Sequence, residues 1–393
     1  MLVGCSFGGL EFLYRYARRA GAQPPGALTV IDRRALHPYI PLAHEALSEV
    51  RPDAALHFDA RAFCEALGAT FIESAAVAVC TGRRVVALAT GGEVAYDRLV
   101  LAVGSVARVP ATLPGREAAH AVKFVSDAVA LRDLLARRAW AGEAPPQVVV
   151  AGGGITGTEW AAELAGTRLR SGGERARVTV VQRAPTLLPT FAPGVARRAA
   201  RVLHALDVRV VTGRSIAAVD AAGATLDDGT RVPADAVVWA GGVRPAPLVA
   251  TLAAEGAELT ADGHLAVSPR LAVHGLRDVY AVGDAARVVS EPAGEPWPTM
   301  ERAIEAIWQG ALLGRRLGAG HGPTSGPVHR LRRDFFYGLS LGPRHSLLVY
   351  KRFVLDSLAF VWFRRWLQWA YYARFRLLAR VRRRAAPAAR PAA

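Results

Sequence analysis

Two glycine-rich turns have the residue spacing that nucleotide phosphates require. The first is Gly4-Cys5-Ser6-Phe7-Gly8-Gly9 and the second is Gly152-Gly153-Gly154-Ile155-Thr156-Gly157. Glycine lets the backbone turn sharply and lets a pyrophosphate approach, and a following helix offers free N–H groups to the phosphates. A third segment carries Gly283-Asp284 after a strand. Two such turns indicate two bound dinucleotides, which suits an enzyme that passes a hydride from a nicotinamide to a flavin.

The elements around the second turn fit this interpretation. Residues 147–151 are predicted to form a buried parallel strand and residues 158–169 a helix. Gly152, Gly154 and Gly157 complete the G-x-G-x-x-G pattern between them. The sequence therefore predicts a strand, a phosphate-binding turn and a helix in that order.

The first turn departs from the pattern at one position. Ser6 stands where the middle glycine is usual, and only residues 1–3 precede the turn, fewer than the five or so of an ordinary strand. A helix is expected over residues 10–20 and a second strand over 27–31, with Asp32 at its end. An acid there can accept hydrogen bonds from ribose hydroxyls, although a solvated turn residue is the alternative.

Composition limits the classes of protein that remain. The 393 residues are 52% hydrophobic, enough for two or three domains with buried cores. The three cysteines, Cys5, Cys64 and Cys80, are far apart in the sequence and form neither a C-x-x-C pair nor a metal-binding pattern. We therefore expect no redox disulfide and no metal site, and we expect the protein to reside in a reducing cytoplasm. Cys5 is expected to be a small buried residue. No N-terminal signal peptide is expected.

Most of the positive charge lies in the C-terminal region. The net charge is +16, and residues 329–393 contain 15 Lys and Arg against two acids, a net charge of +13. An apolar stripe recurs there at helical spacing, while Arg364, Arg365 and Gln368 lie away from it; its members are Leu355, Leu358, Trp362, Trp366, Trp369 and Ala373. Trp, Tyr and Arg together favour an in-plane helix on an anionic membrane surface, formed by residues 352–384.

Other interpretations of this region stay open. The first is a core helix packed on the body with its arginines in water. Nucleic acid is not predicted as a partner, because bulky Trp side chains suit lipid better than a phosphate track. No apolar stretch approaches the roughly 20 residues that span a bilayer. Residues 385–393 are expected to be disordered.

The arrangement of the first half of the chain repeats in the second. Each glycine turn is followed by a predicted hairpin and then by a buried closing strand, over residues 98–105 and 235–242. The predicted fold is α/β, with two Rossmann-like three-layer dinucleotide-binding domains, the second inserted in the first, and a C-terminal amphipathic helical tail. The expected ranges are 1–115 with 270–328 for the FAD domain, 116–269 for the NAD(P)H domain and 329–393 for the tail.

On these motifs the chain resembles the FAD-dependent pyridine nucleotide-disulfide oxidoreductases, and among them the type II, non-proton-pumping NADH dehydrogenases. The resemblance covers nearly the whole chain. Its most specific segment, residues 30–42, contains Asp32, Arg33, His37, Pro41 and Leu42. The other segments that carry it are residues 96–105, 156–159, 239–243 and 280–284.

The resemblance implies roles for individual residues. FAD would contact Gly4, Ser6, Gly8, Gly9, Asp32, Arg33, Gly104 and Asp284, with Pro41 near the flavin ring. NAD(P)H would contact Gly152, Gly154, Ile155, Gly157, Gln182, Gly241 and Gly242. Glu159 would lie near the nicotinamide and quinone pockets, although an acid favoured by the dipole at a helix N-terminus is an equal alternative.

Two further departures concern the substrates. Gln182 stands where an acid usually selects NADH, and Arg183 follows it, so NADPH is not repelled. The quinone-pocket pattern of the family corresponds to residues 303–310, where Ile304 and Trp308 replace two glutamines and Gln309 remains. The identity of the electron acceptor is thus open.

The predicted function is transfer of a hydride from NAD(P)H to FAD and of electrons onward to a membrane quinone. The predicted location is peripheral, on the cytoplasmic face of the cell membrane, and the resemblance makes a homodimer plausible. The alternatives are a soluble NAD(P)H-dependent reductase of a protein acceptor, which the basic surface would dock, and a slow-turnover redox sensor. A sulfide:quinone oxidoreductase is disfavoured, because Cys64 and Cys80 lie in the wrong segments for a flavin-flanking pair.

Overall fold

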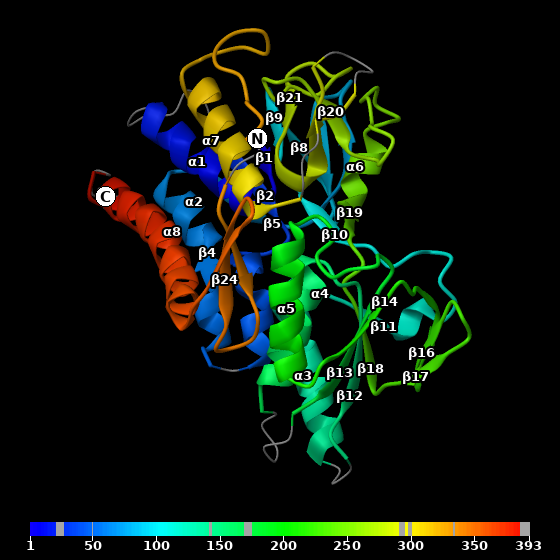
Figure 1. The fold of residues 1–393 in the computed structure, drawn as a ribbon. Coiled ribbons are helices and arrows are strands. Elements are labelled where there is room, and N and C mark those ends of the chain that lie inside the picture. The colour runs from blue at the N-terminus through cyan, green and yellow to red at the C-terminus, as the bar shows by residue number, and fades with distance from the viewer. Residues whose placement is uncertain are drawn as a thin grey trace.

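The first of two parallel sheets has the order β21-β9-β1-β2-β5 (Figure 1). The computed structural model describes residues 1–20, 27–48, 50–140, 144–168, 175–290, 295–297, 301–332 and 335–385. The strands of this sheet are β1 (Leu2–Val3), β2 (Thr29–Asp32), β5 (Thr70–Glu73), β9 (Leu99–Leu101) and β21 (Val279–Ala281). Because β21 pairs with β9, the chain returns to its first sheet late in the sequence, as predicted.

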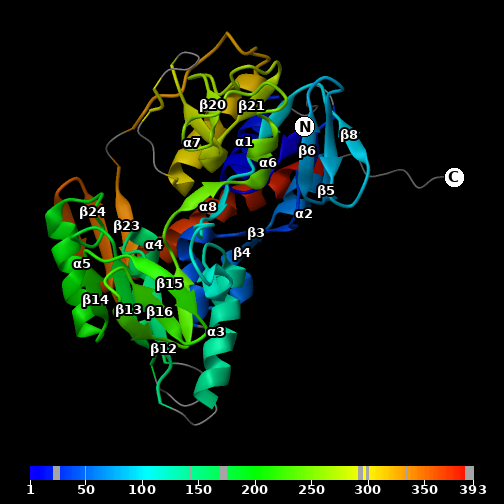
Figure 2. The same cartoon turned by 90° about the vertical axis from the view of Figure 1, so that its right-hand side faces the viewer.

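The second sheet is also parallel and five-stranded, in the order β11-β18-β12-β13-β14. Its strands are β11 (Ala119–Ala121), β12 (Gln147–Ala151), β13 (Arg177–Gln182), β14 (Arg209–Thr212) and β18 (Ala236–Trp239). Helices α3 (Val125–Trp140), α4 (Ile155–Gly166) and α5 (Pro193–Ala205) surround it, and Figure 2 shows α3 and α5 on different sides. Two Rossmann-like units with the second inserted confirm the predicted fold class; the exact boundaries stay a prediction.

Each unit carries a three-stranded antiparallel sheet where a hairpin was predicted. The first is β6 (Ala76–Cys80), β7 (Val85–Leu88) and β8 (Glu93–Ala95), and the second is β15 (Ile216–Asp220), β16 (Gly223–Leu226) and β17 (Arg231–Pro233). Between the units, β10 (Ser105–Ala107) pairs antiparallel with β19 (Val243–Pro245). The two segments in which the chain passes from one unit to the other are therefore hydrogen-bonded to each other.

Shorter elements complete the first unit. They are β3 (Leu36–Pro38), η1 (Ile40–Leu47), η2 (Asp53–Leu56), β4 (His57–Asp59), α2 (Ala60–Ala66), α6 (Pro247–Thr251), β20 (Leu265–Val267), η4 (Gly283–Ala285) and β22 (Ala286–Val288). The short helix η3 (Arg116–Ala118) packs against β15 of the second unit.

Two helices of the first unit lie unusually close together. They are α1 (Phe7–Arg19) and α7 (Ala303–Gly318). A Cβ atom on Gly310 would lie 2.2 Å from the carbonyl oxygen of Gly8, and one on Gly314 would lie 2.4 Å from that of Phe12. Glycines four residues apart on α7 thus bring its backbone onto α1, just after the first glycine turn.

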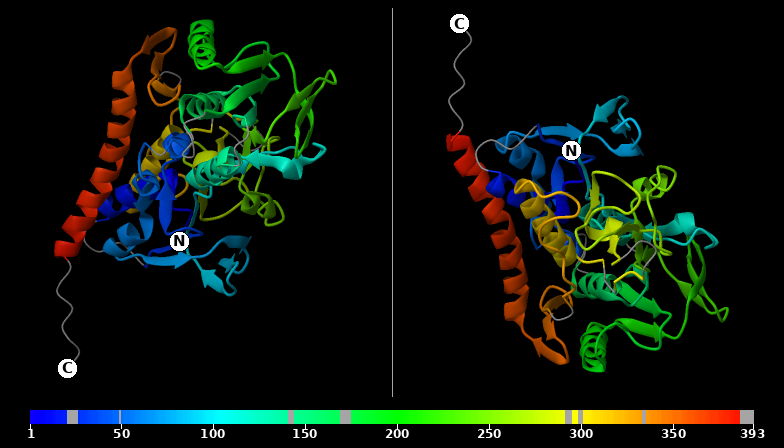
Figure 3. Two further views of the ribbon diagram at one scale, coloured as in Figure 1. Left: turned by 90° about the horizontal axis from the view of Figure 1, so that it is seen from below. Right: turned by 90° about the horizontal axis from the view of Figure 1, so that it is seen from above.

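The C-terminal region joins both units. A sheet of β23 (Tyr337–Ser340), β24 (Ser346–Tyr350) and β25 (Phe353–Asp356) precedes α8 (Leu358–Ala385). Leu339 and Leu347 are buried in the core that contains α4, whereas Tyr372 and Phe375 of α8 are buried in the core of the first unit. Figure 3 shows α8 running along one side of the molecule. In the part of the chain that the structure describes, no helix is long and apolar enough to span a bilayer.

The orientation of α8 differs from the core-helix alternative. Arg364 and Gln368 are buried at 8% and 2% exposure. Trp362, Trp366 and Trp369 are each more than half exposed. Arg364 and Gln368 therefore face the body and the tryptophans face outward, so an interpretation with this stripe in the core is wrong, although Arg376, Arg380 and Arg383 further along α8 are exposed as that alternative expected.

Candidate active site

The two glycine turns have the same backbone geometry. Gly4 and Gly152 have φ angles of +93° and +106°, which side chains rarely adopt. A Cβ on Gly9 would lie 2.1 Å from the oxygen of Gly4, and one on Gly157 would lie 1.8 Å from that of Gly152. Helices α1 and α4 therefore start directly at their turns, three residues earlier than predicted, with their first N–H groups at the turn.

Ser6 and Gly154 occupy equivalent positions as the residues that precede these helices. A Cβ on Gly154 would meet no atom within 4 Å. The protein itself thus leaves room for a side chain at this position. Ser6 makes no hydrogen bond that caps α1.

Asp32 and Gln182 hold the two turns in the same way. Asp32 Oδ2 accepts a hydrogen bond from the N–H of Cys5 at 2.6 Å, and Gln182 Oε1 accepts one from the N–H of Gly153 at 2.9 Å. Burial raises the pKa of Asp32 above its ordinary value, against the lowering effect of its hydrogen bonds. A contact of either side chain with a ribose stays a prediction.

A cavity of about 240 Å³ lies where the two units meet. Gly4 to Gly8, Asp32 and Asp284 line it from the first unit, and Thr156, Glu159 and Trp160 line it from the second. Arg33 and Gly104 also line it, as expected from the sequence. The backbone of Gly104 has a φ angle of +67°.

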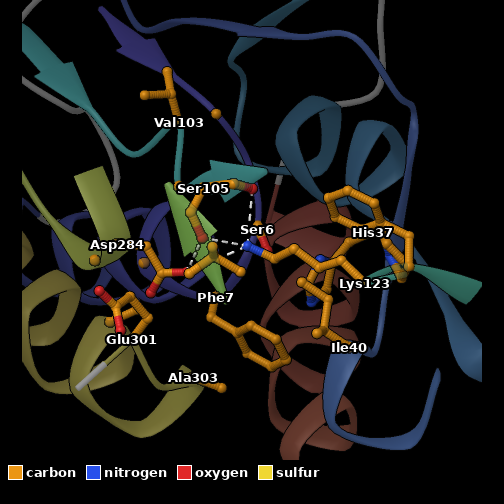
Figure 4. A pocket seen from close by; sticks show the side chains of 18 of the residues that line it. Ser6, Phe7, His37, Ile40, Val103, Ser105, Lys123, Asp284, Glu301 and Ala303 are labelled. Carbon is orange, nitrogen blue, oxygen red and sulfur yellow. Dashed lines mark hydrogen bonds and ion pairs between the residues drawn. The ribbon is translucent and has the colours of Figure 1, made fainter. Parts of the chain in front are cut away.

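Lys123 completes a polar group in this cavity that the sequence reasoning missed (Figure 4). Ser105 Oγ donates a hydrogen bond to Asp284 Oδ2 at 2.5 Å. Lys123 Nζ donates to the backbone carbonyl oxygen of Ser105 at 2.8 Å and lies 3.3 Å from Asp284 Oδ2. Burial lowers the pKa of Lys123, and the Asp284 carboxylate opposes that effect. The feature of the sequence that could have pointed to Lys123 is the rarity of lysine, since the chain has only two.

His37 is a second polar residue of the cavity wall. It is 3% exposed, and neither ring nitrogen has a hydrogen-bond partner in the structure. Burial lowers its pKa to about 3, so the ring is neutral, with one donor and one acceptor nitrogen. Two glycine cradles, unpartnered polar atoms and the open cavity together fit a bound dinucleotide.

Glu159 lies between this cavity and the C-terminal helix. Its Oε1 accepts the N–H of Ser340 at 2.9 Å and lies 3.5 Å from Arg364 Nη2, while His44 Nδ1 is 3.9 Å from Oε2. Burial raises the pKa of Glu159 to about 7 despite the nearby Arg364 guanidinium. A buried carboxyl that titrates near neutral pH can hold or give up a proton. His44 and Arg364 were not predicted as site residues.

The structure also locates the remaining predicted residues. Pro41 contributes its carbonyl oxygen, which accepts a hydrogen bond from Arg364 Nη2 at 3.1 Å. Gly241 and Gly242 are exposed and follow β18 at the carboxyl edge of the second sheet, and Ile155 is the first residue of α4. Their contacts with NAD(P)H stay a prediction.

The three residues predicted for a quinone pocket have other contacts. Gln309 is 2% exposed, and its Oε1 accepts the N–H of Gly283 at 2.7 Å. Trp308 packs edge-on against Phe335 and lies under the Arg332 guanidinium. Ile304 is partly buried on α7. None of the three lines the cavity described above, and their quinone role stays a prediction.

Residues 1–310 match the family model for pyridine nucleotide-disulphide oxidoreductase, and the chain belongs to this family. This membership confirms the predicted class, an oxidoreductase with FAD and NAD(P)H as cofactors.

Two relatives and one solved structure show what the chain is similar to. A demethylphylloquinone reductase of Synechocystis sp. is 29% identical over 299 residues, 72% of this chain and 71% of that protein. A type II NADH:quinone oxidoreductase of Mycobacterium tuberculosis is 30% identical over 244 residues, which are 56% of this chain but only 49% of the relative. The structure of NDH2 from Plasmodium falciparum in complex with NADH superposes with a TM-score of 0.78 at 15% identity, covering 97% of this chain and 96% of the other. The last comparison confirms the fold.

Proposed function

We propose that the protein is an NAD(P)H dehydrogenase that passes a hydride from NAD(P)H to FAD and then electrons to a quinone, without pumping protons. The observation that carries this proposal is the meeting of the two units at one cavity, which residues of both α1 and α4 line. Two dinucleotides held by these helices would bring their reactive rings into the same space.

Each unit supplies one set of binding residues. In the first, the turn at Gly4, Asp32 and Asp284 would hold FAD, and neutral His37 would hydrogen-bond to it. In the second, the turn at Gly152 would hold NAD(P)H. FAD supplies the chemistry of two-electron transfer when bound, and the protein orients the partners and excludes water.

Glu159 is the residue we assign to proton handling. It lines the shared cavity and is held by Ser340 and Arg364. Burial raises the pKa of Glu159 to about 7, so part of the population is protonated at neutral pH and can donate a proton to the reduced quinone. The quinone acceptor is supported by the similarity to a demethylphylloquinone reductase and to a type II NADH:quinone oxidoreductase.

We also propose that α8 lies on an anionic membrane surface at the cytoplasmic face. The outward position of Trp362, Trp366 and Trp369 supports this, since Trp favours the interface between lipid and water. Residues 352–384 contain no acid after Asp356, and each basic residue near anionic lipid contributes about 1 kcal/mol.

The test is oxidation of NADH and NADPH by the purified FAD-loaded protein, with a short-chain menaquinone analogue and anionic liposomes. We expect turnover that depends on the quinone and slows in Glu159→Gln, with a control in which ferricyanide replaces the quinone. Reduction of the flavin by NAD(P)H without quinone turnover would contradict a quinone acceptor and favour a protein acceptor or a sensor.

A further inference from the structure

Among the described residues, four acids line the cavity that both units share, and each has a basic side chain close to it. A dinucleotide brings two phosphates with it, so a cavity lined by uncompensated carboxylates would repel it. The pairs are Asp32 with Arg33 and Arg34, Glu159 with Arg364, Glu301 with Arg287, and Asp284 with Lys123.

Lys123 reaches its acid from the other unit (Figure 4). It follows β11 at the carboxyl edge of the second sheet, and its N–H donates to Asp127 Oδ2 at 2.8 Å where α3 begins. Asp284 belongs to the first unit and lies in η4, just after β21. The lysine side chain therefore crosses from the unit whose turn would hold NAD(P)H to the unit whose turn would hold FAD.

One oxygen of Asp284 takes both contacts that its carboxylate makes with the described part of the chain. Ser105 Oγ donates to Oδ2 at 2.5 Å, and Lys123 Nζ lies 3.3 Å from the same atom. Lys123 Nζ also donates to the carbonyl oxygen of Ser105 at 2.8 Å, which fixes the end of the lysine side chain. Oδ1 is thus the oxygen that the carboxylate offers to a ligand.

The charge of Asp284 alone would oppose reduction of a flavin in this cavity. Transfer of a hydride adds two electrons and one proton, so the flavin gains one negative charge and the nicotinamide leaves with one positive charge. A fixed carboxylate nearby disfavours that gain, and a fixed cation favours it. The side chains of Lys123 and Asp284 are 11% and 20% exposed, so water screens their charges only in part.

Resting on the FAD site of the proposed function, we infer that Lys123 is a positioning residue that holds Asp284 for the cofactor and cancels the charge of its carboxylate, which favours reduction of the flavin. The other acid near Lys123 is Glu301, and its charge is already met by Arg287. Because Lys123 is fixed to the second unit, its charge reaches Asp284 only when the two units meet as they do in this structure.

A double-mutant cycle tests the inference. Lys123→Met removes the cation, Asp284→Asn removes the carboxylate, and the double variant removes both charges. Lys123→Arg keeps the positive charge. Lys351→Met is the matched control, because Lys351 is the other lysine of the chain and is exposed in the turn between β24 and β25.

Two measurements are made on each variant, and neither uses a quinone. The first is the midpoint potential of the bound flavin, from anaerobic reductive titration against an indicator dye. The second is the Kd for FAD, from quenching of flavin fluorescence as FAD rebinds to protein stripped of it. Lys123→Met should weaken FAD binding about tenfold or more, since it loses a hydrogen bond to a charged group.

We expect the midpoint potential to fall in Lys123→Met, to rise in Asp284→Asn and to return close to wild type in the double variant. Lys123→Arg and Lys351→Met should stay near wild type. A purely structural role would weaken FAD binding without these opposite shifts in potential. An unchanged potential in Lys123→Met, or shifts of the same sign in both single variants, would overturn the inference.

The inference can also be tested if Lys123→Met retains too little FAD for the titration. Binding that is restored in Lys123→Arg would then support a role for the charge, and binding that is not restored would contradict it. If the potentials shift as expected but the wild type passes no electrons to a quinone, the proposed function fails while this inference stands.

Discussion

Glu163→Gln should make the protein markedly more stable at alkaline pH and leave its stability at acid pH nearly unchanged. Glu163 lies on α4 one turn after Glu159 and is 1% exposed, and the Ser48 side chain, which lowers its pKa, only partly offsets the burial of its carboxylate. Burial, the largest cause, raises its pKa from 4.5 to about 7. A shift of that size corresponds to about 3 kcal/mol of unfolding free energy.

The sign follows from the direction of the shift. Below pH 4.5 the carboxyl is neutral in both the folded and the unfolded chain, so its burial carries no ionisation penalty. As the pH rises toward 7, the unfolded chain releases this proton and the folded protein retains it, so the unfolding free energy falls. Above about pH 7 the loss is complete, and glutamine avoids it because it never ionises.

The assay is urea unfolding of wild type and Glu163→Gln at pH 5 and pH 8.5. We expect unfolding free energies within about 1 kcal/mol of each other at pH 5, and a variant that is about 3 kcal/mol more stable at pH 8.5. Glu65→Gln, a change at an exposed glutamate on α2, is the control for general charge effects. An equal difference between wild type and variant at both pH values would refute the reasoning.

Two further predictions concern the substrates and the membrane. In Gln182→Glu the carboxylate can still accept the N–H of Gly153 but repels a 2′-phosphate, so the KM for NADPH should rise more than that for NADH in steady-state assays; equal changes would contradict this role. Replacing Trp362, Trp366 and Trp369 by serine should release the protein from anionic vesicles in a flotation assay while its NADH–ferricyanide rate persists. Unchanged flotation would exclude this face of α8 as the contact.

The phosphate-binding turns could be predicted because their geometry is local. Gly4 and Gly152 need positive φ angles, and Gly9 and Gly157 need the absence of a side chain, within six residues in each case. The strand of residues 147–151 was predicted with its exact ends for the same reason. Helix starts were placed too late, because the pattern of apolar residues begins only after the turn itself.

Contacts between distant segments could not be predicted in this way. The sequence separation of Cys5 and Cys64 suggested no relation, yet their Sγ atoms lie 3.8 Å apart in the core of the first unit. The hydrogen bond between them and burial raise the pKa of Cys5 well above its usual value, so Cys5 is a packed thiol. The expected burial of Cys5 is confirmed. Its contact with Cys64, however, results from the packing of α2 under the first sheet, which the spacing of the cysteines does not indicate.

Helix α8 was predicted from the spacing of its apolar residues, and this spacing does not indicate which side of the helix faces the protein. A stripe of Trp and Leu with Arg on the other side fits either a core helix or a membrane helix. What decides between them is that the body offers α8 specific polar partners, namely the carbonyl oxygen of Pro41, Glu159 and Glu45. Buried arginines are favourable only with such partners, so the polar side turns inward and the Trp side outward.

This orientation gives one rigid element two roles in the proposed function. The inner side of α8 brings Arg364 to Glu159, at the edge of the cavity that both units line, and its outer side carries the exposed tryptophans. An apolar cavity of about 180 Å³ under α8 is lined by Arg364 on the inner side and by Phe363 and Leu367 on the outer side. A lipophilic acceptor that leaves a bilayer along α8 would therefore meet apolar side chains first and a hydrogen-bond donor last. Removing α8 should then abolish quinone turnover even with a water-soluble quinone, because the helix holds Glu159 through Arg364 in addition to its proposed membrane contact.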